Sequence, residues 1–301
     1  MVRVIVLIVA GALCGLVAPA AAGYITTVEG DNPTAYWRLE ETSGSDPAVS
    51  EVGGAGLSGT YQGGVTPGVA GPRPGDFPGL PATNRAARFG TTADAHVEVP
   101  DQAALDITGA VTLEALVNLD NLPSGGNAGI VAKYLGDGDQ RSYNLFVEGN
   151  NDTGALGMVI SPDGTFGAGT VTLQDDQALD IGRWLHVAGV YEPDNFMKLY
   201  IDGQPVETFE EPSTDIPSAI HSGTAPLWIG TQFAPSSADN HFPGIIDEVA
   251  VYDAALGDQA ISAHHEAAIT PEPTVGMLVW VSGLMLLARR KSTRPQSKKQ
   301  S

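Results

Sequence analysis

The feature that most constrains the fold is a succession of short apolar runs between residues 86 and 252, separated by turn-forming segments. In residues 111–118 every second side chain from Val111 is apolar, while Thr112 and Glu114 lie on the other face, as in a half-buried strand. The expected strands are residues 86–89, 96–99, 111–118, 129–135, 143–148, 156–161, 184–191, 197–202, 226–231 and 245–252. With 37 glycines, 21 prolines and no βαβ alternation, the pattern predicts an all-β sandwich or jelly roll.

Three local signals add detail to this pattern. Asp202-Gly203 lies between apolar runs and indicates a type I′ hairpin. Residues 258–267 are expected to form the one helix, with Asp258 as N-cap and Ile261 on its buried face. Residues 43–84 are rich in Gly, Pro and Ser, and we expect loops there with one short strand near residues 59–61.

The charge between the two ends excludes several kinds of partner. Residues 23–270 carry 34 Asp or Glu and 8 Lys or Arg, a net charge of −26. Nucleic acid and acidic membrane surfaces require the opposite sign. Such a charge favours solubility and divalent cations.

The N-terminal residues 1–22 have the pattern of a secretory signal peptide. Arg3 precedes an apolar stretch, and Ala20 and Ala22 form a small-x-small site that predicts cleavage by signal peptidase before Gly23. The one cysteine, Cys14, lies inside this segment. The mature chain would then contain no disulfide, thiolate catalyst or cysteine-ligated metal.

The C-terminal residues 269–301 contain three consecutive signals. The motif Pro271, Glu272 and Pro273 is followed by an apolar span, residues 275–288, and by the basic cluster Arg289, Arg290 and Lys291 within the polar tail 289–301. A 14-residue helix rises about 21 Å, short of the roughly 30 Å hydrocarbon core, so it suits a transient transmembrane anchor. Positive charge after the span would stay cytoplasmic.

This tail resembles the PEP-CTERM sorting signal, which implies export, transient tethering in the inner membrane, handling by an exosortase-type transpeptidase, and delivery to the cell surface or extracellular matrix. The alternatives are an ordinary single-span anchor or an amphipathic helix packed on the domain. The continuation of the chain to Ser301 departs from the family pattern, in which tails usually stop soon after the basic cluster.

Six sequence blocks resemble the LamG-like jelly-roll family of the concanavalin A-like lectin/glucanase superfamily. They are residues 35–41 (AYWRLEE), 111–115 (VTLEA), 130–133 (IVAK), 183–191 (RWLHVAGVY), 197–203 (MKLYIDG) and 242–252 (FPGIIDEVAVY). The resemblance implies two antiparallel sheets packed face to face over residues 23–268. Leu116 stands where the family commonly has tryptophan. Family members serve mostly in binding, adhesion or spacing, often with carbohydrate and a structural calcium ion.

Calcium is the one cofactor expected, because Ca²⁺ is bound by several oxygen ligands and the many acidic residues of the chain could supply them. The first and last strands should be neighbours in this fold, which would bring Glu40 or Glu41 near Asp247 or Glu248. A second candidate is the pair Asp137 and Asp139 in one turn. The alternatives are a structural hydrogen bond for Asp247 and solvated turn acids elsewhere.

Carbohydrate binding uses exposed aromatic side chains that stack on sugar rings. Tyr134, Tyr143, Phe233 and His241 are the candidates near strand ends and loops. Trp37, Trp184 and Trp228 are expected to be core residues instead. The six histidines contain no zinc-binding HExxH pair, and His186 is expected to be a packing residue.

Glycoside hydrolysis requires two facing carboxylates, and no strand carries an alternating pair suited to it. Glu40 and Glu41 are adjacent and point to opposite faces. We therefore expect an exported, non-catalytic surface or matrix protein that binds glycan or mediates adhesion. A purely structural matrix component and a polysaccharide hydrolase or lyase are the alternatives.

Overall fold

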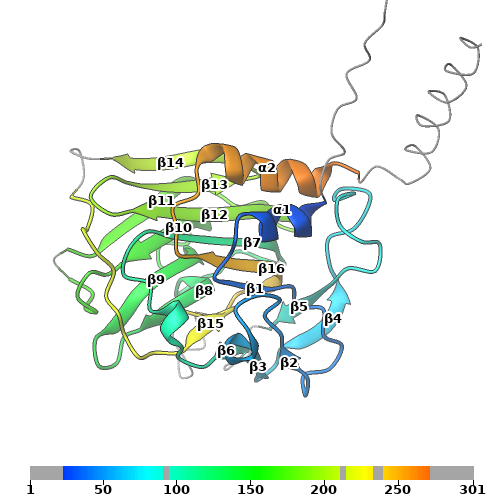
Figure 1. Ribbon diagram of the computed structural model, residues 1–301, viewed down its shortest axis with the longest axis horizontal. Coiled ribbons are helices and arrows are strands. Elements are labelled where there is room, and N and C mark those ends of the chain that lie inside the picture. The colour runs from blue at the N-terminus through cyan, green and yellow to red at the C-terminus, as the bar shows by residue number, and fades with distance from the viewer. Residues whose placement is uncertain (1–22, 91–94, 168, 211–214, 233–239, 272–301) are drawn as a thin grey trace, which may run out of the picture. The chain divides into compact units, whose positions relative to one another are not determined.

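The protein is a sandwich of two antiparallel β-sheets, as the computed structural model in Figure 1 shows. The structure describes residues 23–90, 95–167, 169–210, 215–232 and 240–271. The predicted fold class, an all-β jelly-roll-like sandwich, is confirmed. All named strand pairs in both sheets are antiparallel.

The first sheet is built around β7 and β16, which pair along most of their length. Its strands in spatial order are β14 (Gln204–Glu210), β13 (Phe196–Ile201), β12 (Leu185–Glu192), β7 (Val111–Leu119), β16 (Gly244–Tyr252), β5 (Arg85–Phe89) and β4 (Thr66–Ala70). A further strand, β1 (Ala35–Trp37), pairs with β16, so the first and last strands of the sandwich are neighbours as expected.

The second sheet faces the first across the core. Its strands in spatial order are β11 (Val171–Ala178), β10 (Ala155–Ile160), β9 (Gln140–Val147), β8 (Ala128–Leu135), β15 (Leu227–Ile229), β6 (His96–Val99), β3 (Gly59–Gln62) and β2 (Pro47–Ala48). Two single-turn 3-10 helices, Ala55–Leu57 and Ala103–Leu105, lie in the connections.

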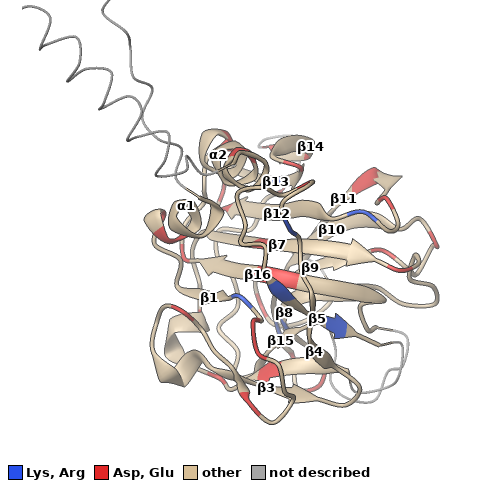
Figure 2. Ribbon diagram, turned by 90° about the vertical axis from the view of Figure 1, so that its right-hand side faces the viewer, with Lys and Arg blue, Asp and Glu red and all other residues tan. Residues whose placement is uncertain are grey.

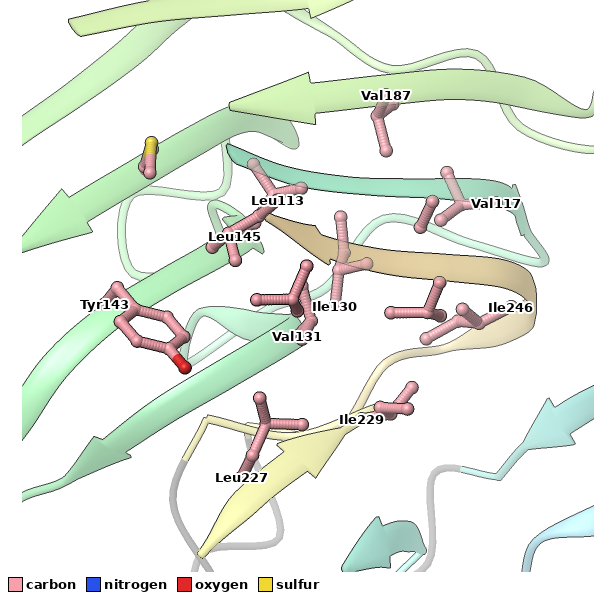
Figure 3. Packing of buried hydrophobic residues seen from close by; sticks show 14 of the residues in the cluster. Leu113, Val117, Ile130, Val131, Tyr143, Leu145, Val187, Leu227, Ile229 and Ile246 are labelled. Atoms are coloured by element: carbon pink, nitrogen blue, oxygen red, sulfur yellow. The ribbon is translucent and has the colours of Figure 1, made fainter. Parts of the chain in front are cut away.

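The core lies between the two sheets, where alternate side chains of each strand meet (Figure 3). Leu113 and Val117 of β7 point into it from one sheet, and Tyr143 and Leu145 of β9 from the other. Since neighbouring residues of a strand point to opposite faces, the intervening side chains of β7 and β9 lie on the outer faces of the sandwich. What covers those outer faces decides where a ligand can bind.

The outer face of the first sheet is covered by two helices and by the loop between β4 and β5, residues 71–84. The helices α1 (Tyr24–Gly30) and α2 (Asp258–Ile269) contact each other, and Figure 1 shows them beside the first sheet. Tyr24 of α1 and Ala268 of α2 pack with Leu116 of β7. Leu116 is the residue that stands where the family commonly has tryptophan. Phe77 of the loop joins the same cluster.

Gly79 of that loop connects the two helices. Its carbonyl accepts a hydrogen bond from the amide of Tyr24 (3.4 Å), and its own amide donates to the carbonyl of Ala268 (2.8 Å). A Cβ at this position would lie 1.8 Å from the carbonyl oxygen of Ala267, so only glycine allows the approach. The beginning of α1 and the end of α2 are therefore held at one place.

Most predicted elements are confirmed, with four corrections. Asp202 and Gly203 both have positive φ (50° and 72°), as a type I′ hairpin requires. Residues 43–84 contain three strands rather than one, β11 was not expected, and neither was α1. Finally, the N-cap of α2 is Gly257 and not Asp258, whose carboxylate instead accepts hydrogen bonds from Tyr200 and Lys198.

The expected signal peptide and most of the sorting signal lie outside the described residues. This holds for Ala20, Ala22, Glu272, Pro273, the span 275–288 and the basic cluster, whereas Pro271 is described and exposed. Among the described helices, none is both long and apolar enough to cross a membrane.

Candidate functional site

A pocket of about 550 Å³ opens on the outer face of the second sheet. Its apolar floor comes from one outward side chain on each of three neighbouring strands: Tyr134 of β8, Phe146 of β9 and Val159 of β10. These three side chains pack together with Ala132, apart from the main core. At the rim, Phe166 is 70% exposed and is the most exposed large apolar side chain among the described residues.

Gly157 of β10 allows the floor to form. A Cβ at this position would lie 2.5 Å from the Phe146 ring, and real Cβ atoms do not approach so closely. The Phe146 ring therefore packs directly against the backbone of the neighbouring strand at Gly157.

Arg141, at the start of β9, lies against the aromatic floor. Its guanidinium carbon is 5.6 Å from the centroid of the Tyr134 ring, within the range of a cation–π interaction. Burial raises the pKa of Tyr134 to about 12, although the Arg141 charge opposes the rise, so the phenol stays neutral at physiological pH.

Amide side chains form one wall of the pocket. Asn144 Nδ2 donates to Gln232 Oε1 (2.8 Å), and Gln232 Nε2 donates to Asn240 Oδ1 (3.2 Å). Asn144 Oδ1 is buried and has no hydrogen-bond partner among the described residues. Gln232 and Asn240 line the pocket, and their amides can offer both donors and acceptors to a polar ligand.

Two loops also line the pocket, and Glu148 organises one of them. Its carboxylate accepts hydrogen bonds from the amides of Asn151 (2.6 Å) and Thr153 (3.0 Å) and from both of their side chains. Burial acts to raise the pKa of Glu148, but these hydrogen bonds lower it below the usual value. The loop that contains Asn127 is joined to this one, because Asn127 Oδ1 accepts a hydrogen bond from Asn150 (2.7 Å). Glu148 is the one carboxylate among the described lining residues, and it is already engaged.

The predicted ligand residues have different outcomes. Tyr134 lines the pocket. Tyr143 is fully buried and its hydroxyl donates to the carbonyl of Leu105, so the expectation that it is available near a strand end is wrong. His241 is also buried, with Nδ1 3.2 Å from the carbonyl of Ala95, and does not line the pocket. Phe233 lies outside the described residues.

The predicted core tryptophans are buried to different degrees. Trp37 and Trp228 are buried, while Trp184 is half-buried and packs against the cluster beneath the helices.

The predicted calcium residues of the first and last strands do come together, around a guanidinium group. Arg38 donates to Glu40 (2.9 Å) and to Glu248 (3.2 Å), and Tyr36 also donates to Glu248. Asp247 Oδ2 accepts from Asn84 (2.7 Å), whereas its Oδ1 is buried and has no partner among the described residues.

The remaining predicted ligands lie apart from this group. Glu41 instead accepts from Tyr61 (2.7 Å), and Asp137 and Asp139 lie in an exposed turn between β8 and β9. Across the part of the chain that the structure describes, no three His, Cys, Asp or Glu side chains are arranged to hold a metal ion. A calcium ion at Asp247 stays a prediction, and it would have to compete with Arg38.

Burial controls the protonation of this group. It raises the pKa of Glu248 to about 7, although Arg38 and the Tyr36 hydroxyl oppose the rise. It also raises the pKa of Asp247 well above its usual value, and the neighbouring charge of Glu248 adds to the effect.

A second group of ionisable side chains, the covered acid–histidine cluster, consists of Glu114, His186, His264, Asp31 and Tyr24. Glu114 is fully buried beneath the helices and lies 2.8 Å from His264 Nδ1 and 3.1 Å from His186 Nε2. His264 Nε2 lies 3.0 Å from Asp31, and the Tyr24 hydroxyl donates to Glu114 (3.0 Å). His186 is completely buried, which agrees with its expected structural role.

Glu114 and His264 stabilise each other's charged forms. Burial raises the pKa of Glu114, but the charges of His264 and His186 outweigh it and hold the pKa well below the usual range. Burial lowers the pKa of His264, but Glu114 and Asp31 raise it overall. Glu114, His186 and His264 are fully buried beneath the helices, so this part of the cluster stabilises the fold and is not open to a ligand.

Several residues of the pocket were not among the candidates from sequence. Arg141, Phe146, Phe166, Gln232 and Asn240 all line it. The alternation within β9, where Tyr143 and Leu145 point inward, was the available signal that Phe146 faces outward.

The comparisons with known proteins agree with this fold. A family model described as the concanavalin A-like lectin/glucanases superfamily matches residues 90–262. No curated protein sequence matches the chain.

Among solved structures, the binding domain of Paraclostridial Mosquitocidal Protein 1 is similar, with a TM-score of 0.58, 12% identity and coverage of 79% of this chain and 52% of that one. The chain thus spans about half the length of that structure. Domain 4 of AbnA, an extracellular arabinanase from Geobacillus stearothermophilus solved in complex with arabinotriose, has a TM-score of 0.53, 14% identity and coverage of 77% and 98%.

A Trypanosoma rangeli sialidase has a TM-score of 0.50 and 15% identity, and the match covers 77% of this chain and 32% of that one. At these identities the likeness shows the fold.

Proposed function

Because this chain belongs to the concanavalin A-like lectin/glucanases superfamily, we propose that it is a non-catalytic glycan-binding protein whose ligand occupies the pocket on the second sheet. The observation that carries the proposal is the composition of that pocket: an aromatic floor, an exposed aromatic rim and a wall of amides. Aromatic rings stack on the apolar faces of sugars, and amides hydrogen-bond their hydroxyls. The arabinotriose complex of the structurally similar AbnA domain supports the choice of ligand class.

The test is a glycan array with the full chain, followed by titration calorimetry on the best oligosaccharide. Phe166→Ala removes the exposed ring at the rim, and we expect about tenfold weaker binding, the effect of losing one stacked ring. Ile181→Ala is the matched control, because Ile181 is 53% exposed and does not line the pocket. Equal affinities for both variants would contradict binding at this pocket.

Hydrolysis or lysis of a polysaccharide is the second candidate function, and the structural likeness to a sialidase gives it some weight. A glycosidase generally needs two carboxylates about 5–9 Å apart. Glu148 is the one carboxylate among the described lining residues, and it holds a loop. Turnover of a polysaccharide that is lost on one carboxylate substitution would favour an enzyme. A structural matrix component would give neither binding nor turnover.

The proposal includes export and sorting. Signal peptidase would cleave after Ala22, and an exosortase-type transpeptidase would recognise Pro271, Glu272 and Pro273 before release at the surface or into the matrix. Intact mass of the protein from each fraction of the producing cells tests this. A mass from Gly23 to residues 271–274 in the medium or matrix is expected. A chain retaining Ser301 in the membrane fraction would make the tail a plain anchor.

A structural calcium ion near Asp247 is the remaining element of the proposal. It is supported by the buried Oδ1 without a partner and by the excess of acidic residues, which Figure 2 shows spread over many loops and strands. Addition of a chelator should lower the melting temperature of the wild type but not of Asp247→Asn. An unchanged melting temperature in the wild type would contradict a calcium ion.

A further inference from the structure

Arg141 differs from every other basic residue of the described chain. Five of the eight make ion pairs, namely Arg38, Arg88, Lys133, Arg183 and Lys198. Two more, Arg73 and Arg85, donate to backbone carbonyls. The guanidinium of Arg141 has neither kind of partner among the described residues, and its one contact of note is the Tyr134 ring.

An unpaired guanidinium is unexpected in a chain this acidic. The whole sequence has 35 Asp or Glu against 15 Lys or Arg, so acidic partners are abundant. Asp137 and Asp139 lie in the turn just before Arg141, yet no ion pair joins them to it. Glu148 is the sole described carboxylate that lines the pocket. Its two oxygens already accept four hydrogen bonds from its own loop.

The side chain of Arg141 is also held in position rather than solvated. It is half-buried, and its Nε atom is buried with no hydrogen-bond partner among the described residues. The Tyr134 ring lies on one side of the guanidinium. Arg141 lines the pocket, and a planar guanidinium carries parallel N–H donors that match a carboxylate bidentately.

From this arrangement we infer that the pocket binds an acidic glycan, a chain containing uronic acid residues, and that Arg141 pairs with the carboxylate of one such residue. This inference rests on the proposed glycan binding and adds the substrate class to it. The amide wall of Gln232 and Asn240 would bind the hydroxyls, and the Phe166 ring would cover a sugar face. A neutral glycan would offer the guanidinium hydroxyl acceptors but no opposite charge.

The test compares acidic oligosaccharides with their neutral counterparts. Oligogalacturonate and oligomannuronate are titrated against the full chain, alongside the same chains with each carboxyl reduced to a primary alcohol. We expect the acidic form of at least one to bind about tenfold more tightly than its reduced form, the order of a charge-assisted hydrogen-bonded pair.

Arg141→Met should abolish that preference, because it keeps an unbranched apolar stem and removes the charged guanidinium group. Arg141→Lys should retain part of it, since lysine keeps the charge without the fork. Arg88→Met is the matched control. Arg88 is 40% exposed and pairs with Asp120. Arg88 lies on β5 and Asp120 directly follows β7, so the pair belongs to the first sheet and not to the sheet that carries the pocket, and loss of Arg88 changes the net charge equally. Melting temperatures of all variants check that the fold is intact.

Two results separate the failure of this inference from the failure of the proposed function. If no acidic form binds more tightly than its reduced form, while Phe166→Ala still weakens binding, the ligand is neutral and the role of Arg141 is overturned. If no oligosaccharide of the panel or the array binds, or if Phe166→Ala has no effect, glycan binding at this pocket is itself wrong.

Discussion

On both outer faces of the sandwich, alternate side chains of a strand point away from the core. On one face these side chains are covered, and on the other they are open. On the first sheet, Glu114 of β7 points outward and is sealed beneath α1 and α2, where two histidines face it. On the second sheet, Phe146 of β9 points outward and Arg141 lies beside it in an open pocket. Charged side chains on the covered face pair with one another, whereas Arg141 on the open face is left for a ligand. A polar residue on a strand thus acquires its role from what covers it.

The largest effect should come from breaking the covered face. Glu114→Gln leaves His264 and His186 facing a neutral amide in a buried site, and removing one partner of a buried ion pair costs about 3–5 kcal/mol. Urea denaturation of this variant and of Glu29→Gln measures the loss. Glu29 is exposed on α1, so its variant should match the wild type. Similar stabilities for the two variants would show that the cluster contributes little.

The next effect tests whether the open face is as tightly packed as the covered one. Gly157→Ala would force the Phe146 ring upward, and overpacking of this kind costs about 1–3 kcal/mol. Because the ring moves toward the pocket, glycan affinity should fall together with stability. Thermal unfolding and calorimetry on the same sample measure both quantities. Unchanged affinity would place the ligand away from Phe146.

The pH dependence should also differ between the faces. The pKa of Glu114 is lowered, so its stabilising contribution is present above its usual value and is lost as the pH falls through the lowered one. The pKa of His264 is raised, so its contribution is present below about 6.5 and is lost as the pH rises through the raised value. Together they stabilise the fold most between about pH 4.5 and 6.5.

Denaturation measured from pH 6 to 9 should therefore show falling stability, and His264→Asn should have a shallower slope. In both proteins Glu248 adds to the loss of stability as the pH rises toward 7. Its pKa is raised to about 7 because burial of its charged form is unfavourable. Glycan affinity should stay constant over this range, since an arginine remains charged. Equal slopes for the wild type and His264→Asn would contradict a charged His264.

The smallest expected effect is on stability at the rim of the pocket. Phe166→Ala should change the free energy of unfolding by less than about 0.5 kcal/mol, because an exposed side chain contributes little packing. Its effect on glycan affinity is large, as proposed above. The opposite result, a large loss of stability with unchanged affinity, would make Phe166 a packing residue and remove the contrast between the faces.

The strands were predictable because their alternation reflects burial on one side, as in β7, where Val111 and Leu113 both reach the core. That rule missed β11, since Asp175 and Asp176 interrupt its apolar pattern. It also missed α1, whose Thr26 and Thr27 favour strands.

The site was less predictable than the fold. Tyr134 was a candidate, but Arg141 and Gln232 were not, because their meeting depends on how β8, β9 and the segment after β15 lie in space. The wrong expectation for Tyr143 has a physical cause as well. A tyrosine near a strand end is exposed only if its register places it on the outer face, and the Leu105 carbonyl satisfies its hydroxyl inside the core.

The hydrogen bonds of Gly79 have a consequence for how this domain would be displayed. They hold the amide of Tyr24 and the carbonyl of Ala268 at one spot on the covered face. A linker attached at either end would leave from that spot, and the pocket lies on the opposite face. The attachment points and the pocket are therefore on opposite faces, so a linker at either end would leave the pocket uncovered.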